Sequence, residues 1–269
     1  MSSLAEVFTA ARAERRAVLV GYLPAGYPTV DGAVEAMVAM VRGGVDVVEV
    51  GLPYSDPLMD GPTIQRAVEE ALAGRTTTTD VVGTVGAVAA TGAPTLVMTY
   101  WNPIERYGPR RFAEELAAAG SAGVITPDLT PDEAGPSDWL AVTDATGLAR
   151  VFLVAPSSTD DRLRMTTAQC TGFVYAASTM GVTGTRDAVG EAAGTLVRRV
   201  RAVSRIPVCV GLGVSNAAQA AQVASFADGV IVGSAFVRAL LDAATPEAGV
   251  KDVETLAGEL AQGVRGARR

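Results

Sequence analysis

Histidine is absent from this sequence of 269 residues, and lysine occurs once, at Lys251. The first absence excludes Ser–His catalytic triads and histidine general bases, and it removes the usual ligands of catalytic zinc. The single lysine is poorly placed for Schiff-base chemistry, because it lies near the end of the sequence among acidic residues. Acid–base chemistry must therefore fall to carboxylates, tyrosines or water, and we expect no metal site.

Cysteine and long apolar stretches are also scarce. Cys170 and Cys209 are far apart and match no zinc-binding pattern, so we expect both to be reduced and buried. No run of eighteen apolar residues predicts a membrane span, and Met1–Arg16 lacks the order of a secretory signal, which favours a cytoplasmic protein. The net charge of −7, with scattered arginines, argues against nucleic-acid binding.

β-branched apolar runs alternate with alanine-rich stretches, a pattern that is typical of parallel βα units. Eight such runs at this length favour a closed (β/α)8 TIM barrel over an open sheet, and the only G-x-G comes too late for a dinucleotide-binding fingerprint. No linker divides the chain, so we expect one domain over residues 1–269. The predicted strands are Ala17–Leu23, Val45–Val50, Pro94–Thr99, Ala122–Thr126, Arg150–Val154, Gly172–Ala176, Ile206–Val210 and Gly229–Val232.

Helix ends are also predictable. Ser3-x-x-Glu6 before an apolar run is a capping box, and it predicts a short extra N-terminal helix that plugs one end of the barrel. Glycines at Gly44, Gly74 and Gly120 stand where a left-handed residue would end a helix.

The second predicted strand carries a carboxylate, Glu49, within an otherwise apolar run. Alternation along the strand places Val47, Glu49 and Gly51 on one face, with Val48 and Val50 on the other. Catalytic residues of a barrel lie at the carboxyl ends of its strands, and a buried carboxylate is unfavourable unless it is paired, protonated or used. We therefore favour a functional Glu49; the alternative is a structural glutamate bonded to backbone or to a tyrosine.

The segment Leu52–Pro62 follows this strand and is rich in turn residues, with three prolines that limit the entropy lost on ordering. It is typical of a lid. Asp56 and Asp60 are candidates for substrate contact; alternatively, they are turn residues or N-caps of a helix that begins near Pro62.

Glycines cluster after the last three strands, at Gly181–Gly184, Gly211–Gly213 and Gly233–Ser234. Close backbone approach and free N–H groups at such places favour a phosphate site, with help from a helix beginning near Ser234. Aromatic and polar side chains that could hold a bicyclic ring also fall at strand ends, at Tyr22, Tyr100, Trp101, Asn102 and Tyr175.

Several segments together resemble the α subunits of tryptophan synthase along nearly the whole chain. The matching segments are Val48–Gln65, Met98–Pro103, Pro127–Leu129, Gly181–Gly184, Gly211–Ser215 and Gly233–Ser234. The resemblance implies a lyase of tryptophan biosynthesis that cleaves indole-3-glycerol phosphate to indole and glyceraldehyde 3-phosphate by a retro-aldol reaction. It also implies that this subunit uses no cofactor.

The resemblance assigns a role to each matching residue. Glu49 would protonate indole C3 and take the proton of the glycerol hydroxyl, Asp60 would accept the indole N–H, and Tyr175 would orient Glu49 through its hydroxyl. Thr183 would lie in a mobile loop that meets Asp60. The implied phosphate contacts are Gly184, Gly213, Gly233 and Ser234, with Gly211 as a further substrate contact, and the implied walls of the indole pocket are Tyr22 and Tyr100. Tyr22 and Leu212 stand where relatives often carry phenylalanine.

The resemblance further implies a partner, the pyridoxal-phosphate-dependent β subunit, in an α2β2 complex whose interface would include Asp56, Pro57 and Asn102. Two alternatives stay open: a free-standing lyase with the same chemistry, and a non-catalytic barrel that binds a phosphorylated metabolite and regulates a partner.

Overall fold

A computed structural model of the chain describes residues 3–135, 137–177 and 186–267. Its strands are parallel and form one sheet in the order β5-β4-β3-β2-β1-β9-β8-β7-β6. The strands are β1 (Val18–Pro24), β2 (Val47–Gly51), β3 (Thr95–Met98), β4 (Gly123–Ile125), β5 (Ala149–Val151), β6 (Leu153–Val154), β7 (Val174–Ala177), β8 (Val208–Gly211) and β9 (Gly229–Val232).

The two edge strands of this sheet, β5 and β6, are consecutive in the chain and are separated only by Phe152. Backbone hydrogen bonds continue on both sides of the break, from Thr126 N–H to Val151 O at 3.2 Å and from Tyr175 N–H to Phe152 O at 3.1 Å. The chain therefore closes the sheet into a barrel. The (β/α)8 barrel is confirmed, and the predicted fifth strand is present as two short segments.

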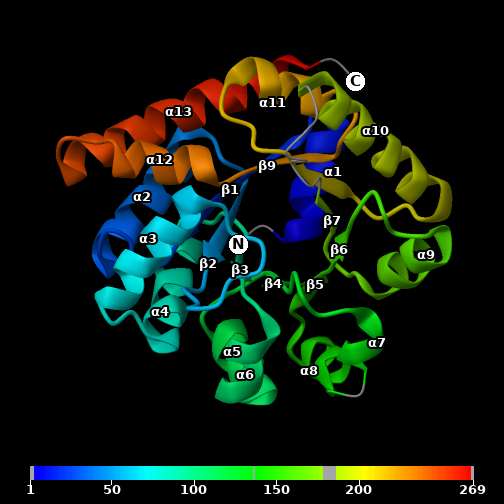
Figure 1. Ribbon diagram of the computed structural model, residues 1–269, viewed down its shortest axis with the longest axis horizontal. Helices are drawn as coiled ribbons and strands as arrows, with labels where there is room; N and C mark the ends of the chain where they lie inside the picture. Colours follow the sequence, from blue (N-terminus) through cyan, green and yellow to red (C-terminus); the bar gives the residue numbers. More distant parts are fainter. Residues whose placement is uncertain (1–2, 136, 178–185, 268–269) are drawn as a thin grey trace.

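Helices surround the sheet in a ring, as Figure 1 shows. Several connections carry two helices in place of one, including α3 and α4 between β2 and β3. The helices are α1 (Leu4–Ala13), α2 (Val30–Gly43), α3 (Pro62–Ala73), α4 (Thr78–Ala89), α5 (Trp101–Tyr107), α6 (Pro109–Ala118), α7 (Pro131–Ala134), α8 (Trp139–Thr146), α9 (Asp160–Gln169), α10 (Arg186–Val203), α11 (Ala217–Ala224), α12 (Ser234–Leu241) and α13 (Pro246–Gly266). Within the described ranges, none of them combines the length and the hydropathy that crossing a membrane requires.

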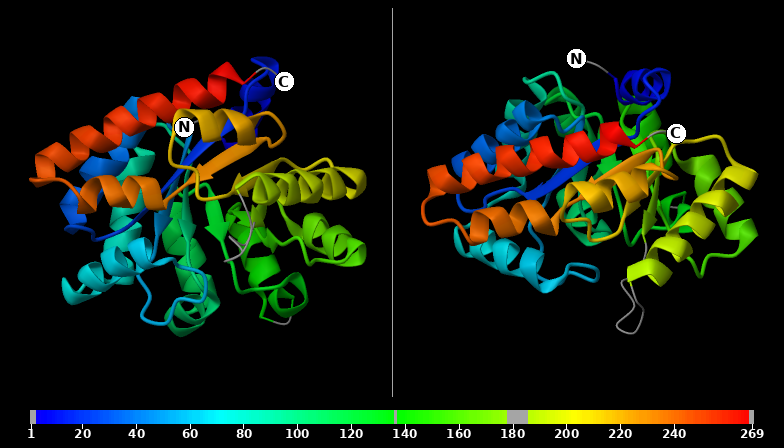
Figure 2. Two further views of the ribbon diagram at one scale, coloured as in Figure 1. Left: turned by 45° about the horizontal axis from the view of Figure 1, so that its top comes forward. Right: turned by 90° about the horizontal axis from the view of Figure 1, so that it is seen from above.

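Two hydrophobic cores follow from the alternation of side chains along each strand. The inner core fills the barrel, where Val18, Val47 and Phe173 pack with Leu4 and Phe8 of α1. The predicted plug is thus confirmed, and Figure 2 shows α1 at the end of the barrel opposite α3 and the loop before it. The capping box that begins α1 is present, with Ser3 and Glu6 bonded reciprocally.

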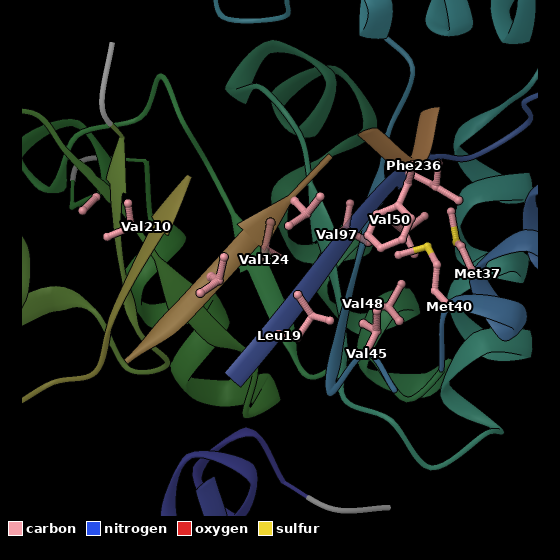
Figure 3. Close-up of a cluster of buried hydrophobic side chains, with 14 of the residues drawn as sticks. Leu19, Met37, Met40, Val45, Val48, Val50, Val97, Val124, Val210 and Phe236 are labelled. Carbon is pink, nitrogen blue, oxygen red and sulfur yellow. The ribbon is translucent and has the colours of Figure 1, made fainter. Parts of the chain in front are cut away.

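The outer core lies between the barrel and its helices. Val48 and Val50 of β2 belong to it, together with Met37 and Met40 of α2 and Phe236 of α12, and Figure 3 shows these side chains beside one another. The alternation predicted for the second strand is therefore confirmed, because Val47 belongs to the inner core.

Two of the three predicted left-handed glycines are confirmed, Gly44 with φ of 108° and Gly120 with φ of 86°. The prediction for Gly74 is wrong, because its φ is −71° and the left-handed residue is Arg75, with φ of 62°. The Thr76 N–H bonds the Ala71 carbonyl at 3.1 Å, so the reversal that ends α3 closes around Arg75.

Candidate active site

A cavity of about 170 Å³ opens at the carboxyl ends of the strands, at the end of the barrel opposite α1. Glu49 and Asp60 both line it, so the two predicted working carboxylates share one compartment. Its described lining residues are Tyr22, Glu49, Met59, Asp60, Ile64, Met98, Tyr175, Gly211, Leu212, Gly213, Ile231, Gly233 and Ser234.

Glu49 lies on the inner face of β2, opposite Tyr22 of β1, and is fully buried. Neither carboxylate oxygen hydrogen-bonds another described residue. The hydrogen bonds that the structural alternative requires, to backbone or to a tyrosine, are therefore not formed among the described residues, and the one expected from Tyr175 is absent. Burial raises the pKa of Glu49 to about 8, because the apolar barrel disfavours the charged form. Near pH 7 this side chain is mostly a neutral acid that can donate a proton.

Asp60 lies in the loop between β2 and α3 and is partly buried. The Tyr100 hydroxyl donates to its Oδ1 at 3.3 Å, and the Gln65 amide donates to its carbonyl at 2.7 Å. Burial raises the pKa of Asp60, and the Tyr100 hydrogen bond opposes that change. Asp60 is not an N-cap, because α3 begins after Gly61.

Asp56 occupies the exposed part of the same loop and does not line the cavity. It accepts a hydrogen bond of 2.6 Å from the Ser55 hydroxyl. Its local role is that of a turn residue, as the alternative for Asp56 predicts.

Two inward-facing tyrosines fit into the barrel because glycine stands beside each of them. A Cβ on Gly51 would lie 2.3 Å from the Tyr22 hydroxyl oxygen, and a Cβ on Gly211 would lie 2.5 Å from that of Tyr175. Gly233 also faces the Tyr22 ring, at 3.1 Å from a virtual Cβ to Cδ1. These glycines make room for the tyrosine rings inside the barrel. Packing is therefore a second reason for glycine at Gly211 and Gly233, which were expected to contact the substrate.

The structure describes part of the expected phosphate site, which forms one corner of the cavity. Gly213, Gly233 and Ser234 line the cavity, and Gly213 has φ of 63°, a conformation that favours glycine. α12 begins at Ser234, so its positive N-terminal end faces this corner. Thr183 and Gly184 lie outside the described residues.

Sequence reasoning missed most of the apolar wall. Met98 and Ile231 line the cavity from the inner faces of β3 and β9, and Ile64 lines it from α3. The alternation that identified Glu49 could have found Met98 and Ile231, because each follows an inward-facing position by two residues. Tyr100, which was expected in the wall, is not among the described lining residues.

The fold and the site together define a class of protein: a parallel barrel whose cavity holds two carboxylates, one of them neutral near pH 7, an arrangement that suits acid–base chemistry. The backbone corner at Gly213 and Gly233 suits an anionic group of the substrate. Among the described residues, no three His, Cys, Asp or Glu side chains are grouped as metal ligands would be.

Comparison with known proteins is consistent with this class. The sequence profile of the family described as tryptophan synthase alpha chain matches residues 8–265. The chain is 58% identical to the tryptophan synthase alpha chain of Thermobifida fusca, with 100% of both chains covered, and 61% identical to that of Streptomyces avermitilis, with 98% and 95% covered. A solved structure of Mycobacterium tuberculosis tryptophan synthase has a TM-score of 0.90 at 56% identity, covering 98% of this chain and 99% of that one.

The chain belongs to the tryptophan synthase alpha chain family. It is accordingly a lyase of tryptophan biosynthesis, as the resemblance implied, and an alpha chain implies a β-subunit partner.

Proposed function

We propose that this chain cleaves indole-3-glycerol phosphate to indole and glyceraldehyde 3-phosphate, with Glu49 and Asp60 as its two working carboxylates. The observation that supports these roles most directly is the pair of unpartnered, buried oxygens of Glu49 in the cavity that Asp60 also lines. A carboxylic acid buried without a partner destabilises the fold, and this barrel retains one where a substrate can reach it.

The protonation states suit the two steps of the cleavage. Neutral Glu49 donates its proton to indole C3, and the ring becomes an indoleninium whose N–H faces the Asp60 carboxylate. Ionised Glu49 then takes the proton of the hydroxyl beside the ring. As the carbonyl forms, the bond from C3 to the side chain breaks and its electron pair restores the aromatic indole. Glu49 ends the cycle protonated, and Asp60 stabilises charge that exists only during the reaction.

The remaining cavity residues would bind the substrate. Tyr22, Tyr175 and Leu212 would flank the indole ring, while Gly213, Gly233 and Ser234 would receive the phosphate through backbone N–H groups and the N-terminus of α12. Thr183, Gly184 and Gly211 complete the proposed substrate contacts.

The setting of the reaction is part of the same proposal. This subunit would work without a cofactor, as one domain in the cytoplasm, and its partner would be the pyridoxal-phosphate-dependent β subunit in an α2β2 complex. The exposed side chains of Leu58 and Met59, at 76% and 49%, lie beside Asp60 and would be covered by such a partner.

Indole release from indole-3-glycerol phosphate by the purified chain, alone and with β subunit, tests this proposal. We expect Glu49→Gln to lower turnover by about 1000-fold with substrate binding retained. The matched control is Glu259→Gln on the exposed face of α13, which should turn over normally.

The outcomes separate the alternatives. Low turnover that rises on adding β subunit supports the α-subunit role, whereas high unaided turnover favours the free-standing lyase. Comparable turnover of Glu49→Gln and the unaltered chain would remove Glu49 from the reaction, and binding without any cleavage would favour the regulatory barrel.

A further inference from the structure

Tyr100 lies between β3 and α5 and is only 6% exposed, yet it is not among the described residues that line the cavity. A tyrosine behind a catalytic loop can act only through the residues that it contacts. Its contacts therefore decide whether it has a role in the reaction.

The Tyr100 hydroxyl contacts the loop between β2 and α3 at two adjacent residues. It accepts a hydrogen bond of 3.0 Å from the Met59 N–H and donates one of 3.3 Å to Asp60 Oδ1. The Gln65 amide donates a hydrogen bond of 2.7 Å to the Asp60 carbonyl. The Met59 N–H, the Asp60 carbonyl and one of the Asp60 carboxylate oxygens are thus each held by a specific donor or acceptor.

The beginning of the loop is attached to the same segment of the chain. The Tyr54 ring packs against the Tyr100 ring with centroids 5.5 Å apart, and the Asn102 amide donates to the Tyr54 hydroxyl at 2.8 Å. Leu58 lies between these attachment points and is 76% exposed. The segment after β3 therefore holds both ends of a loop whose middle is open to solvent.

We propose that Tyr100 is a positioning residue that acts on the cleavage through Asp60, and that it is not a wall of the indole pocket. The inference rests on the proposed role of Asp60. With Oδ1 held by Tyr100, Oδ2 is the oxygen that remains for the indole N–H. A hydroxyl that donates to a carboxylate also favours its ionised form, which is the form that stabilises a positive ring.

Tyr100→Phe tests this inference, because it removes one oxygen atom and keeps the ring that packs on Tyr54. We expect kcat to fall by roughly 10-fold to 100-fold while KM changes by less than about 3-fold, since the loss affects orientation at the reacting ring more than substrate binding. The acid limb of the pH profile of kcat should move to higher pH, because the hydrogen bond that lowers the pKa of Asp60 is gone.

Tyr107→Phe is the matched control. Its hydroxyl bonds Glu115 at 2.5 Å on the outside of the barrel, so its loss should leave kcat and the pH profile unchanged. As a second variant, 3,5-difluorotyrosine at position 100 keeps the hydroxyl as a stronger donor and should move the acid limb to lower pH.

An unaltered kcat and acid limb in Tyr100→Phe would overturn the inference, as would a loss confined to KM. If Tyr100→Phe does not fold, an unshifted acid limb in the difluorotyrosine protein would overturn it instead. Failure of the proposed function looks different, because the unaltered chain would then release no indole in the presence of β subunit.

Discussion

The two ends of the barrel are built from the same strands but have opposite characters. At the end covered by α1, the inner faces carry Val18, Val47 and Phe173 in a closed apolar core. At the other end, two residues further along β2, Glu49 faces a cavity with no hydrogen-bond partner among the described residues. Apolar packing at the closed end thus offsets the destabilisation caused by the unsatisfied acid at the open end.

The largest change in the free energy of unfolding is expected from Phe8→Ala, which removes part of the plug at the closed end of the barrel. Phe8 is 7% exposed and its ring lies 5.9 Å from that of Phe173. The lost contacts and the resulting void should reduce the free energy of unfolding by about 3–5 kcal/mol. Because the cavity lies at the opposite end of the barrel, kcat should be unchanged under conditions in which the variant is folded.

Urea unfolding and indole release, measured on the same preparation, check this prediction. Val7→Ala, on the partly buried side of the same helix, should reduce stability by only about 1 kcal/mol. A fall in kcat that parallels the loss of stability in Phe8→Ala would show that the two ends are not independent.

Glu49→Gln should have the opposite effect on stability at the open end. The pKa of Glu49 is about 8 in the folded chain against an ordinary 4.5, so the unfolded chain releases this proton at lower pH. The resulting destabilisation is absent below about pH 4.5, grows as pH rises and is complete above pH 8. Glutamine cannot ionise, so near pH 7 the variant should gain about 3 kcal/mol relative to the unaltered chain.

The measurement is the free energy of unfolding of both proteins in urea between pH 4 and pH 9. The difference between them should increase across this range and level off above pH 8. A difference that is independent of pH would mean that Glu49 ionises in the folded chain as it does in water.

Ser3→Ala should produce the smallest change. The Ser3 hydroxyl accepts from the Glu6 N–H at 3.2 Å and so caps α1, the helix that plugs the barrel. Loss of this cap should reduce the free energy of unfolding by about 1 kcal/mol. Thermal unfolding checks the change, and Ser3→Thr, which keeps the capping hydroxyl, is the control. Equal stability of the two variants would show that the cap does not contribute.

The expected fold was predictable because period-2 alternation and cap residues are local properties of the chain. The alternation in β2 placed Glu49 on the inner face, and Ser3 with Glu6 predicted α1. Local signals failed at the end of α3, where hydrogen bonds with other residues decide which residue adopts the left-handed conformation. Gly74 and Arg75 are both at the end of α3, and the bond from Thr76 to Ala71 selects Arg75 as the left-handed residue.

By itself, the sequence determined the chemistry that is possible here: without histidine, and with one lysine near the end of the chain, acid–base work is left to carboxylates, tyrosines or water. Only the tertiary structure decided which side chains share a compartment. It brought Glu49 and Asp60 to one cavity, left Tyr175 unbonded to Glu49, and placed Tyr100 behind Asp60. The physical reason is that the pKa of a group and the direction of its hydrogen bonds depend on residues that are distant in the sequence and meet only when the barrel closes.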